Sequence, residues 1–521
     1  MEERTDGKNY SPLFLLALLA SLFLYIWIFS QTPYGQDDWF WGIDYGVRML
    51  LTGGINSRYI GNLLEVIVTR SEFLKAVLLG SIAAAIPSCL VALVRNSIRQ
   101  EPTISRKADN LPLTMLLLAN ILFLTLPMDV WKETYGWIAG FSNYGLAIFF
   151  LAVFQLLVVR AVFDNAPAHS AIAGLGYFIF GVCIQLVLEN MSIFVFLADF
   201  IILVILMLAR GNRKAKILIL VMLIGNIIGL AIMFSSKIYD SLLNTGKALH
   251  GYRSLVIDKN DSIWNNFILL NNRFVYFYPN RIFGNNWLIC SLVSILLLPL
   301  SGKENRLLKI VFRLFALFFL LYFVFAHFFG PLENYITRWN EVLTQRLNLL
   351  FFWGVLCAIL LFSWEGTYKR MILAFVWLSV PGVVLPFIAV KIVGSRYFLF
   401  SSFLLIEFCL FLLAEVYRHR PKWSRITDCF ILLAFVLVSV HRFFIYYDIG
   451  QGKKERDALI RAAQNGEIDR LYFPDLPHKE YIEINEPLDG SAEVKYYREF
   501  YRIPDSVEMH NSLEDFSSPE E

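Results

Sequence analysis

Residues Pro12–Ser30 read PLFLLALLASLFLYIWIFS, an uncharged apolar run long enough to cross a bilayer as a helix, which takes about 20 residues. Further runs of this kind continue almost to the end of the chain, and a window of about 19 residues predicts about thirteen transmembrane helices in all. They lie near Pro12–Ser30, Phe73–Val94, Leu111–Met128, Tyr144–Phe163, Ala171–Leu188, Met191–Ala209, Ile217–Ser235, Asn286–Leu300, Ile310–His327, Leu347–Ser363, Met371–Val390, Tyr397–Val416 and Ile426–Ile445. The sequence therefore predicts an all-α polytopic membrane protein.

Composition supports this fold class. Of 521 residues, 57% are hydrophobic and 17% are charged, whereas a soluble domain carries about 25% charged residues. The six cysteines fall within or at the edges of apolar runs, which favours buried small residues over disulfides. The basic residues lie in loops rather than in one stripe, so the net charge of +3 does not indicate nucleic-acid binding.

The first apolar run resembles a signal peptide in position only. No small-residue cleavage pattern follows it, and residues 31–35 (QTPYG) are typical of a turn that leaves the membrane. We therefore expect an uncleaved first helix.

The loops between the predicted spans differ in charge. Basic residues concentrate in alternate loops, as Arg95, Arg99, Arg106 and Lys107; Arg210, Arg213, Lys214 and Lys216; Lys303, Arg306, Lys309 and Arg313; Lys369 and Arg370; and Arg418, Arg420, Lys422 and Arg425. By the positive-inside rule these loops are cytoplasmic, so the N-terminus lies inside and the C-terminus outside.

Three segments are then long enough to form structure on the outer face. The multi-spanning domain covers residues 1–445. Two of the segments lie within it, the first outer loop (31–72) and a later outer loop (236–285). The third segment is the C-terminal region, 446–521. For the last we predict a small extracytoplasmic αβ appendage with a helix at Lys454–Ala463 and strands at Arg470–Phe473 and Tyr481–Ile484. Its acidic end, Asn511–Glu521, is typical of disorder.

The first outer loop carries the most informative stretch. It reads YGQDDWFW at residues 34–41 and GGINSRYIGN at residues 53–62. Amphipathic patterns at Trp39–Leu51 and Arg58–Val68 flank the Gly53-Gly54 break and predict juxtamembrane helices that lie in the membrane surface.

Adjacent acids, Asp37 and Asp38, follow the first span directly. Repulsion between two carboxylates raises at least one pKa, which makes a better general base. The same pair can also bind a divalent cation such as Mg²⁺ or Mn²⁺ through oxygen ligands. A third interpretation is a helix start, where acids interact favourably with the macrodipole.

This arrangement resembles the GT-C superfamily of membrane glycosyltransferases, which use polyprenyl-phosphate-linked sugars. The shared features are a cytoplasmic N-terminus, an Asp-Asp pair directly after the first span, and juxtamembrane helices in a long first outer loop. The Asn56-Ser57-Arg58-Tyr59 stretch and the region of Trp137 and Asn143-Tyr144 are similar to uncharacterised bacterial members. The resemblance covers the N-terminal half best.

The resemblance implies a reaction on the outer face of a bacterial cytoplasmic membrane. A sugar would pass from a polyprenyl-phosphate donor to a cell-envelope glycan or lipid acceptor, with inversion at the anomeric carbon. Asp37 or Asp38 would deprotonate or orient the acceptor, and both would hold a divalent cation if one is used. Asn56, Arg58 and Tyr59 would contact the acceptor or the sugar.

Such a reaction needs a group that holds the lipid phosphate. Cations are scarce in the predicted outer loops, which makes Arg396, Arg346 and Arg338 candidates. A guanidinium can bind phosphate bidentately and stabilise charge on the leaving group. The alternative is an arginine that snorkels to the membrane interface.

Two further residues are candidates for the sugar-binding side. Glu189 lies between the fifth and sixth predicted spans, where an ionisable residue is either functional or a turn residue that faces water. Trp137 could stack on a sugar or anchor the interface. Arg58 and Glu65, seven residues apart, would form a structural pair at most.

Other function classes remain open. Walker A and Rossmann glycine motifs are absent from the sequence, which argues against ATP hydrolysis and fits a lipid-linked donor. An O-antigen polymerase or ligase is one alternative, although such enzymes usually carry key residues in a large later loop. A secondary transporter or lipid flippase is another; Pro381-Gly382 and Pro386 interrupt one span, but the other half has no matching break.

Overall fold

The structure is a computed structural model. It describes residues 11–54, 56–98, 110–163, 171–209, 212–245, 254–257, 261–299, 306–329, 339–361, 367–391, 393–419, 424–484 and 493–510. Within these residues the chain is almost entirely helical, and its two strands are three residues long each.

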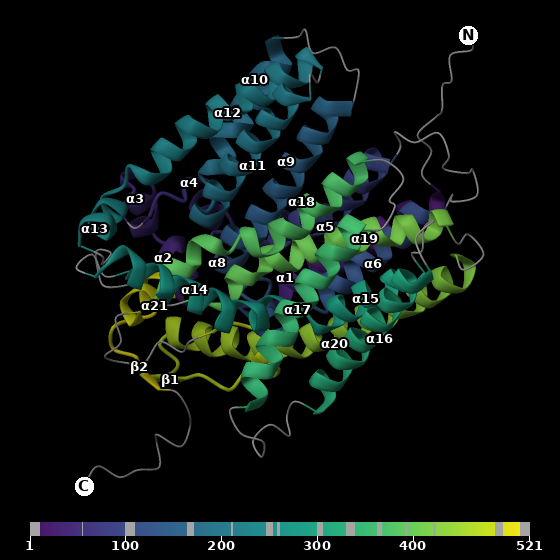
Figure 1. The fold of residues 1–521 in the computed structure, drawn as a ribbon. Helices are drawn as coiled ribbons and strands as arrows, with labels where there is room; N and C mark the ends of the chain where they lie inside the picture. Colours follow the sequence, from purple (N-terminus) through teal and green to yellow (C-terminus); the bar gives the residue numbers. More distant parts are fainter. Residues whose placement is uncertain are drawn as a thin grey trace.

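Long apolar helices form the body of the molecule (Figure 1). Within the described part of the chain, ten helical stretches are long and apolar enough to cross a membrane. Their helices are α1 (Pro12–Gln31), α5 (Glu72–Ile98), α9 (Leu146–Phe163), α11 (Glu189–Leu208), α12 (Arg213–Phe234), α16 (Arg306–Phe329), α17 (Trp339–Leu361), α18 (Thr367–Gly382), α19 (Leu399–His419) and α20 (Ser424–Gln464). Three shorter apolar helices, α6 (Leu111–Leu124), α10 (Ala171–Gln185) and α15 (Trp287–Leu297), occupy the remaining predicted spans. The prediction of an all-α polytopic membrane protein is confirmed, and the count of thirteen crossings stays a prediction.

The helices differ in what they contact. The apolar window of α19 is completely buried, so α19 lies at the centre of the bundle. In contrast, α16 exposes Leu314, Phe318, Leu321 and Phe325. Large apolar side chains in such numbers are unfavourable in water and suit the hydrocarbon of a bilayer.

Helices α10 and α12 pack unusually closely. A Cβ atom added to Gly181 would lie 2.4 Å from the carbonyl oxygen of Met222, and one added to Gly225 would lie 2.3 Å from that of Phe178. Small residues at such crossings let two backbones approach, as is common in membrane bundles.

The short elements gather at one end of the bundle, at the left in Figure 1, which we call the α2–α4 end. They include α2 (Gln36–Gly42), α3 (Asp44–Thr52), α4 (Tyr59–Val68), α7 (Met128–Lys132), α8 (Ile138–Gly140), the π-helix η1 (Phe141–Gly145), α13 (Lys237–Thr245), α14 (Ile263–Pro279), α21 (Val494–Tyr501), β1 (Arg470–Tyr472) and β2 (Glu508–His510). Four further turns are η3 (Asn280–Gly284), η5 (Leu385–Ala389), η6 (Ser395–Phe398) and η8 (Lys479–Tyr481).

The first loop follows the predicted pattern with one correction. The helix predicted at Trp39–Leu51 is two helices, α2 and α3, because the backbone is extended at Ile43. The second predicted helix is α4. Gly53 ends α3 in the left-handed region with φ of +61°, a conformation that glycine adopts at little cost.

The elements that we predicted for the C-terminal region are present in part. The helix predicted at Lys454–Ala463 is the continuation of α20, which runs unbroken for 41 residues through the expected boundary at residue 445. The strand predicted at Arg470–Phe473 is present as β1, which pairs in parallel with β2. The acidic end, Asn511–Glu521, lies outside the described residues.

The strand predicted at Tyr481–Ile484 is wrong. Tyr481 ends the 3₁₀ turn η8, and its ring lies against the Arg442 guanidinium, with the Trp131 ring also within cation–π distance of that group. The Glu483 amide donates to the Gly136 carbonyl at 3.1 Å. Contacts with α20 and with the segment after α7 thus replace a strand ladder, and they fix the C-terminal region to the bundle.

Candidate functional site

A cavity of about 440 Å³ opens at the α2–α4 end. Its walls come from α2–α4, the α8–η1 segment, α13, η6 and the start of α21. The lining residues are Gln36, Asp37, Phe40, Trp41, Tyr45, Met49, Gly54, Asn56, Arg58, Asn62, Glu65, Trp137, Ala139, Asn143, Tyr144, Ile238, Arg396, Glu493 and Tyr496. The volume falls within the range of small-molecule sites, about 300–1,000 Å³.

The adjacent aspartates have different environments. Asp37 lines the cavity, and no hydrogen bond or ion pair within the described part of the chain engages its carboxylate. Asp38 is completely buried, and its two oxygens accept hydrogen bonds from the amides of Gly35 at 2.7 Å and Ala139 at 2.8 Å. The structure thus separates the predicted pair: Asp37 is available to a ligand, and Asp38 joins α2 to α8.

Asp37 is exposed to the cavity, yet the surrounding protein removes enough water from its carboxyl to raise the pKa of Asp37 above its ordinary value. The positive charges of Arg396 and Arg58 oppose this rise, and the negative charge of Glu493 adds to it. Burial also raises the pKa of Asp38, and the two amide donors limit that rise because they favour the charged form. A cavity-facing carboxylate with a raised pKa is a stronger base than an ordinary aspartate.

Arg396 reaches the cavity from η6. Its backbone amide donates to Glu133 Oε2 at 3.1 Å, and its Nη1 lies 3.3 Å from the same oxygen. Its Nε donates to the Tyr144 hydroxyl at 3.3 Å, and the guanidinium lies 5.4 Å from the centre of the Trp137 ring. The structure therefore places this predicted phosphate ligand in the same cavity as Asp37.

Arg58 also lines the cavity, and an ion pair with Glu189 holds its guanidinium. Its Nε lies 3.1 Å and 3.0 Å from the two carboxylate oxygens of Glu189, and its Nη2 lies 2.9 Å from the second. Glu189 in turn accepts a hydrogen bond from the Tyr239 hydroxyl at 2.6 Å. Glu189 does not line the cavity, so its role in this structure is to position Arg58.

Four polar residues that line the cavity form a second group. Asn62 donates to Asn56 at 2.9 Å, and Asn143 donates from its amide nitrogen to the Ala139 carbonyl at 2.9 Å. Glu65 is completely buried, and neither of its carboxyl oxygens has a hydrogen-bond partner within the described residues. Glu65 and Asn62 were not predicted as cavity residues, although their i, i+3 spacing on α4 places them on one helical face.

The α8–η1 segment brings its side chains to the cavity through local distortion. Phe141–Gly145 is a π-helical turn, a feature that often occurs at functional sites. It presents Asn143 and Tyr144 next to each other along the cavity wall. A Cβ atom at Gly61 of α4 would lie 2.6 Å from Asn143 Oδ1, so glycine allows the two segments this close approach.

Helix α21 closes one side of the cavity. Tyr496 packs against Phe40 with ring centres 5.3 Å apart, and Tyr497 packs against Trp39 at 4.8 Å. The ring of Phe500 occupies the space beside Gly42, where a Cβ atom would lie 2.1 Å from it. The C-terminal region therefore contributes directly to the site, which the sequence analysis did not anticipate.

The other predicted site residues have mixed outcomes. Asn56 and Trp137 line the cavity. Tyr59 begins α4 but is not a lining residue; its hydroxyl lies beside Gly53. Arg346 lies exposed on α17 and does not line the cavity. Arg338 lies outside the described residues.

The two aspartates of the predicted cation site face different surroundings. Asp38 faces backbone amides rather than the cavity. Within the described part of the chain, no three His, Cys, Asp or Glu residues are grouped closely enough to hold a metal ion. Asp37 is the member of the pair that could meet a cation carried in with a substrate.

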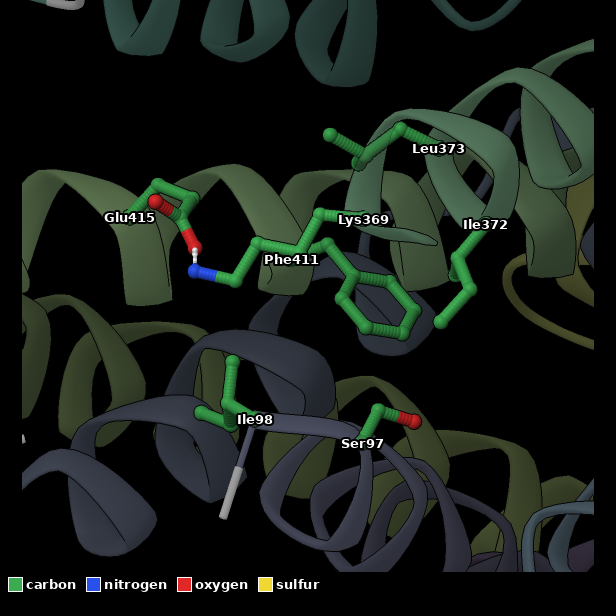
Figure 2. Close-up of a pocket in the computed structure, with 7 residues that line it drawn as sticks. All are labelled: Ser97, Ile98, Lys369, Ile372, Leu373, Phe411 and Glu415. Carbon is green, nitrogen blue, oxygen red and sulfur yellow. Dashed lines mark hydrogen bonds and ion pairs between the residues drawn. The ribbon is translucent and has the colours of Figure 1, made fainter. Parts of the chain in front are cut away.

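A second pocket lies at the opposite end of the bundle, between the end of α5, the start of α18 and the end of α19 (Figure 2). It contains the Lys369–Glu415 ion pair, with a Nζ–Oε1 distance of 2.7 Å. Its volume of about 10 Å³ leaves room for one water at most. This pocket cannot hold a sugar or a lipid headgroup.

Neither the protein-family models nor the curated protein sequences searched gave a match to this chain.

Proposed function

We propose that the protein is an integral membrane glycosyltransferase that moves a sugar from a polyprenyl-phosphate donor to a cell-envelope glycan or lipid acceptor. The observation that carries the proposal is the juxtaposition of Asp37 and Arg396 in one cavity of ligand size, at the end of a bundle of apolar helices. A base and a phosphate-binding cation are the two groups that this transfer needs most.

Asp37 is the base of the proposed reaction. It accepts the proton of an acceptor hydroxyl while the hydroxyl oxygen forms a bond to the anomeric carbon. The bond from that carbon to the phosphate oxygen breaks at the same time, and its electron pair leaves with polyprenyl phosphate. Asp38 is not a second base in this scheme, because its hydrogen bonds to Gly35 and Ala139 hold α2 in position.

Arg396 stabilises the departing phosphate. Its guanidinium is close enough to Asp37 to oppose the rise in the pKa of that carboxyl, and both side chains line one cavity, so both groups can act on one substrate. Arginine binds phosphate well because its planar N–H donors match the phosphate oxygens. Glu133 and Tyr144 orient the side chain for this purpose.

An exposed apolar surface at the α2–α4 end suits a lipid-linked substrate. Helix α14 exposes Ile263, Trp264 and Phe267, with 91%, 67% and 58% of their surfaces accessible. An amphipathic helix with an aromatic apolar face is typical of a membrane interface. A polyprenyl chain could therefore remain in the bilayer while its headgroup enters the cavity.

The test is release of polyprenyl phosphate by purified protein from polyprenyl-phosphate-linked sugars and envelope acceptors. We expect Asp37→Asn to lower kcat by about a hundredfold or more, which is the range for loss of a general base. Asp44→Asn is the matched control, because Asp44 begins α3 nearby, is exposed and does not line the cavity. Adding a chelator to the wild type tests whether a divalent cation takes part.

If folded Asp37→Asn turns over as fast as Asp44→Asn, Asp37 is not the base. If Arg396→Lys, which keeps the charge but loses the bidentate geometry, leaves the KM for the donor and kcat unchanged, Arg396 does not bind the phosphate.

A further inference from the structure

Glu65 is a buried carboxyl whose hydrogen-bonding capacity is unused within the described residues. It lies on α4 with no accessible surface, lines the cavity, and has no hydrogen-bond partner for either oxygen within the described residues. A buried polar group without a partner costs about 1–3 kcal/mol, so nearly all such groups in folded proteins are satisfied. A cost of this kind is expected where a ligand supplies the missing partner.

Two other polar atoms on the cavity wall are in the same condition. Asn143 Oδ1 is a buried acceptor, and Trp137 Nε1 is a buried donor, and neither has a partner among the described residues. Together with the Glu65 carboxyl they leave unpaired donors and acceptors in the cavity wall. A hydroxyl group both donates and accepts, so a ring that carries several hydroxyls fits this set.

The charges around Glu65 disfavour an anionic occupant. Burial raises the pKa of Glu65 well above its ordinary value, and the nearby charges of Asp38 and Asp37 raise it further. Arg58 acts in the opposite direction, but its guanidinium already contacts the Glu189 carboxylate. An added negative charge beside Glu65 would therefore meet two aspartates and an arginine that is already paired.

Asp37 and Glu65 thus interact with different charges. Asp37 is influenced by both Arg396 and Arg58, whereas the groups that act on Glu65 are Asp38, Asp37 and Arg58. Arg396, which is suited to phosphate, is therefore not among the charges that act on Glu65, although both side chains line the cavity.

We propose that Glu65 is a specificity-determining residue, and that with Asn143 Oδ1 and Trp137 Nε1 it binds the hydroxyl groups of an uncharged sugar ring and discriminates against anionic sugars. The ring belongs either to the donor or to the acceptor, since the same hydroxyl chemistry serves both. This inference rests on the proposed glycosyltransferase function for its biological setting, but the binding that it predicts requires no turnover.

The test is calorimetric binding of short alkyl glycosides to the full chain in lipid nanodiscs. The probes are hexyl glucoside, galactoside, mannoside and N-acetylglucosaminide, with hexyl glucuronide as the anionic counterpart of the glucoside. We expect at least one uncharged glycoside to bind, and glucuronide to bind about tenfold more weakly or worse. A tenfold change corresponds to the loss of one well-placed hydrogen bond or one unfavourable charge contact.

Variants at Glu65 assign the effect. Glu65→Gln keeps an uncharged group with donors and an acceptor, so we expect its affinity within about threefold of the wild type. Glu65→Leu keeps the volume but removes the hydrogen bonds, so we expect affinity to fall about tenfold. Folding is controlled by the melting temperature, which Glu65→Leu should not lower, because Leu removes no hydrogen bond that the described fold uses.

Three results would overturn the inference: no uncharged glycoside binds the wild type, Glu65→Leu binds as tightly as the wild type, or glucuronide binds as tightly as glucoside. If polyprenyl phosphate is released at a rate that Glu65→Leu does not change, the inference fails and the transferase proposal stands. If glycosides bind through Glu65 but no sugar transfer occurs, the inference stands and the transferase proposal fails. In an active enzyme, a rise in KM for the donor alone or the acceptor alone shows which sugar occupies the site.

Discussion

Replacing Asp38 by alanine should destabilise the protein strongly, although its neighbour Asp37 can be replaced at little cost. Asp38 is completely buried, and its oxygens accept the amide hydrogens of Gly35 and Ala139 at 2.7 and 2.8 Å. Alanine leaves both buried amides without a partner, at about 1–3 kcal/mol each, so the expected loss is about 2–6 kcal/mol. Native proteins are stable by only about 5–15 kcal/mol, so this is a large share.

The matched substitution at Asp37 gives the contrast. Its carboxylate faces the cavity and makes no hydrogen bond within the described part of the chain. Asp37→Ala should therefore change the free energy of unfolding by about 0.5 kcal/mol or less, as at ordinary accessible positions. Asp38→Asn should fall between the two, because its amide keeps one acceptor oxygen but turns a donor toward the second backbone amide.

Heating purified variants in one detergent and measuring the soluble, monodisperse fraction gives the order of their apparent melting temperatures. Because membrane proteins often unfold irreversibly, the order at a fixed heating rate is the quantity to compare. We expect Asp38→Ala to be lowest, Asp38→Asn next, and Asp37→Ala to match the wild type. Equal melting temperatures for Asp38→Ala and Asp37→Ala would refute the separate structural role of Asp38.

Four further predictions follow from the cavity. Glu65→Leu should raise the melting temperature or leave it unchanged, because it removes an unpaired buried carboxyl. Arg58→Ala and Glu189→Gln should be non-additive in a double-mutant cycle on stability, with a coupling of about 0.5–3 kcal/mol, since the two groups are in contact. Activity should decline on acidification through the raised pKa of Asp37, at higher pH than for an ordinary aspartate, since a base acts only when deprotonated; an acid limb at the ordinary value would contradict this assignment. Tyr496→Ala should raise the substrate KM, and this effect should be larger than its effect on stability when both are expressed as free energies. An unchanged KM would exclude Tyr496 from the binding surface.

The sequence predicted the bundle well because the membrane imposes a local rule. A run of about 20 apolar residues must satisfy its own backbone hydrogen bonds, so hydropathy alone locates the helices. The helices of the first loop were likewise predictable, because amphipathic periodicity and the Gly53 break are local signals. Asp37 was identified for the same reason: it follows the first span directly.

The rest of the cavity depends on contacts between distant residues. The partner of Arg58 is Glu189, 131 positions away, rather than Glu65 on its own helix. Tyr496 reaches α2 from near the end of the chain. No periodicity within a single segment encodes such pairs. The sequence also could not show that both oxygens of Asp38 would accept hydrogen bonds from backbone amides.

The α7–η1 segment links the separate parts of the cavity. The Ala139 amide holds Asp38, the Glu133 carboxylate holds Arg396, and Asn143 lies against Gly61 of α4. A shift in this segment would therefore move the proposed base, the proposed phosphate ligand and the Glu65 side of the cavity together. This common attachment explains how a site built from residues hundreds of positions apart can keep a fixed geometry, and it makes the short α7–η1 segment as important to the site as the Asp-Asp motif itself.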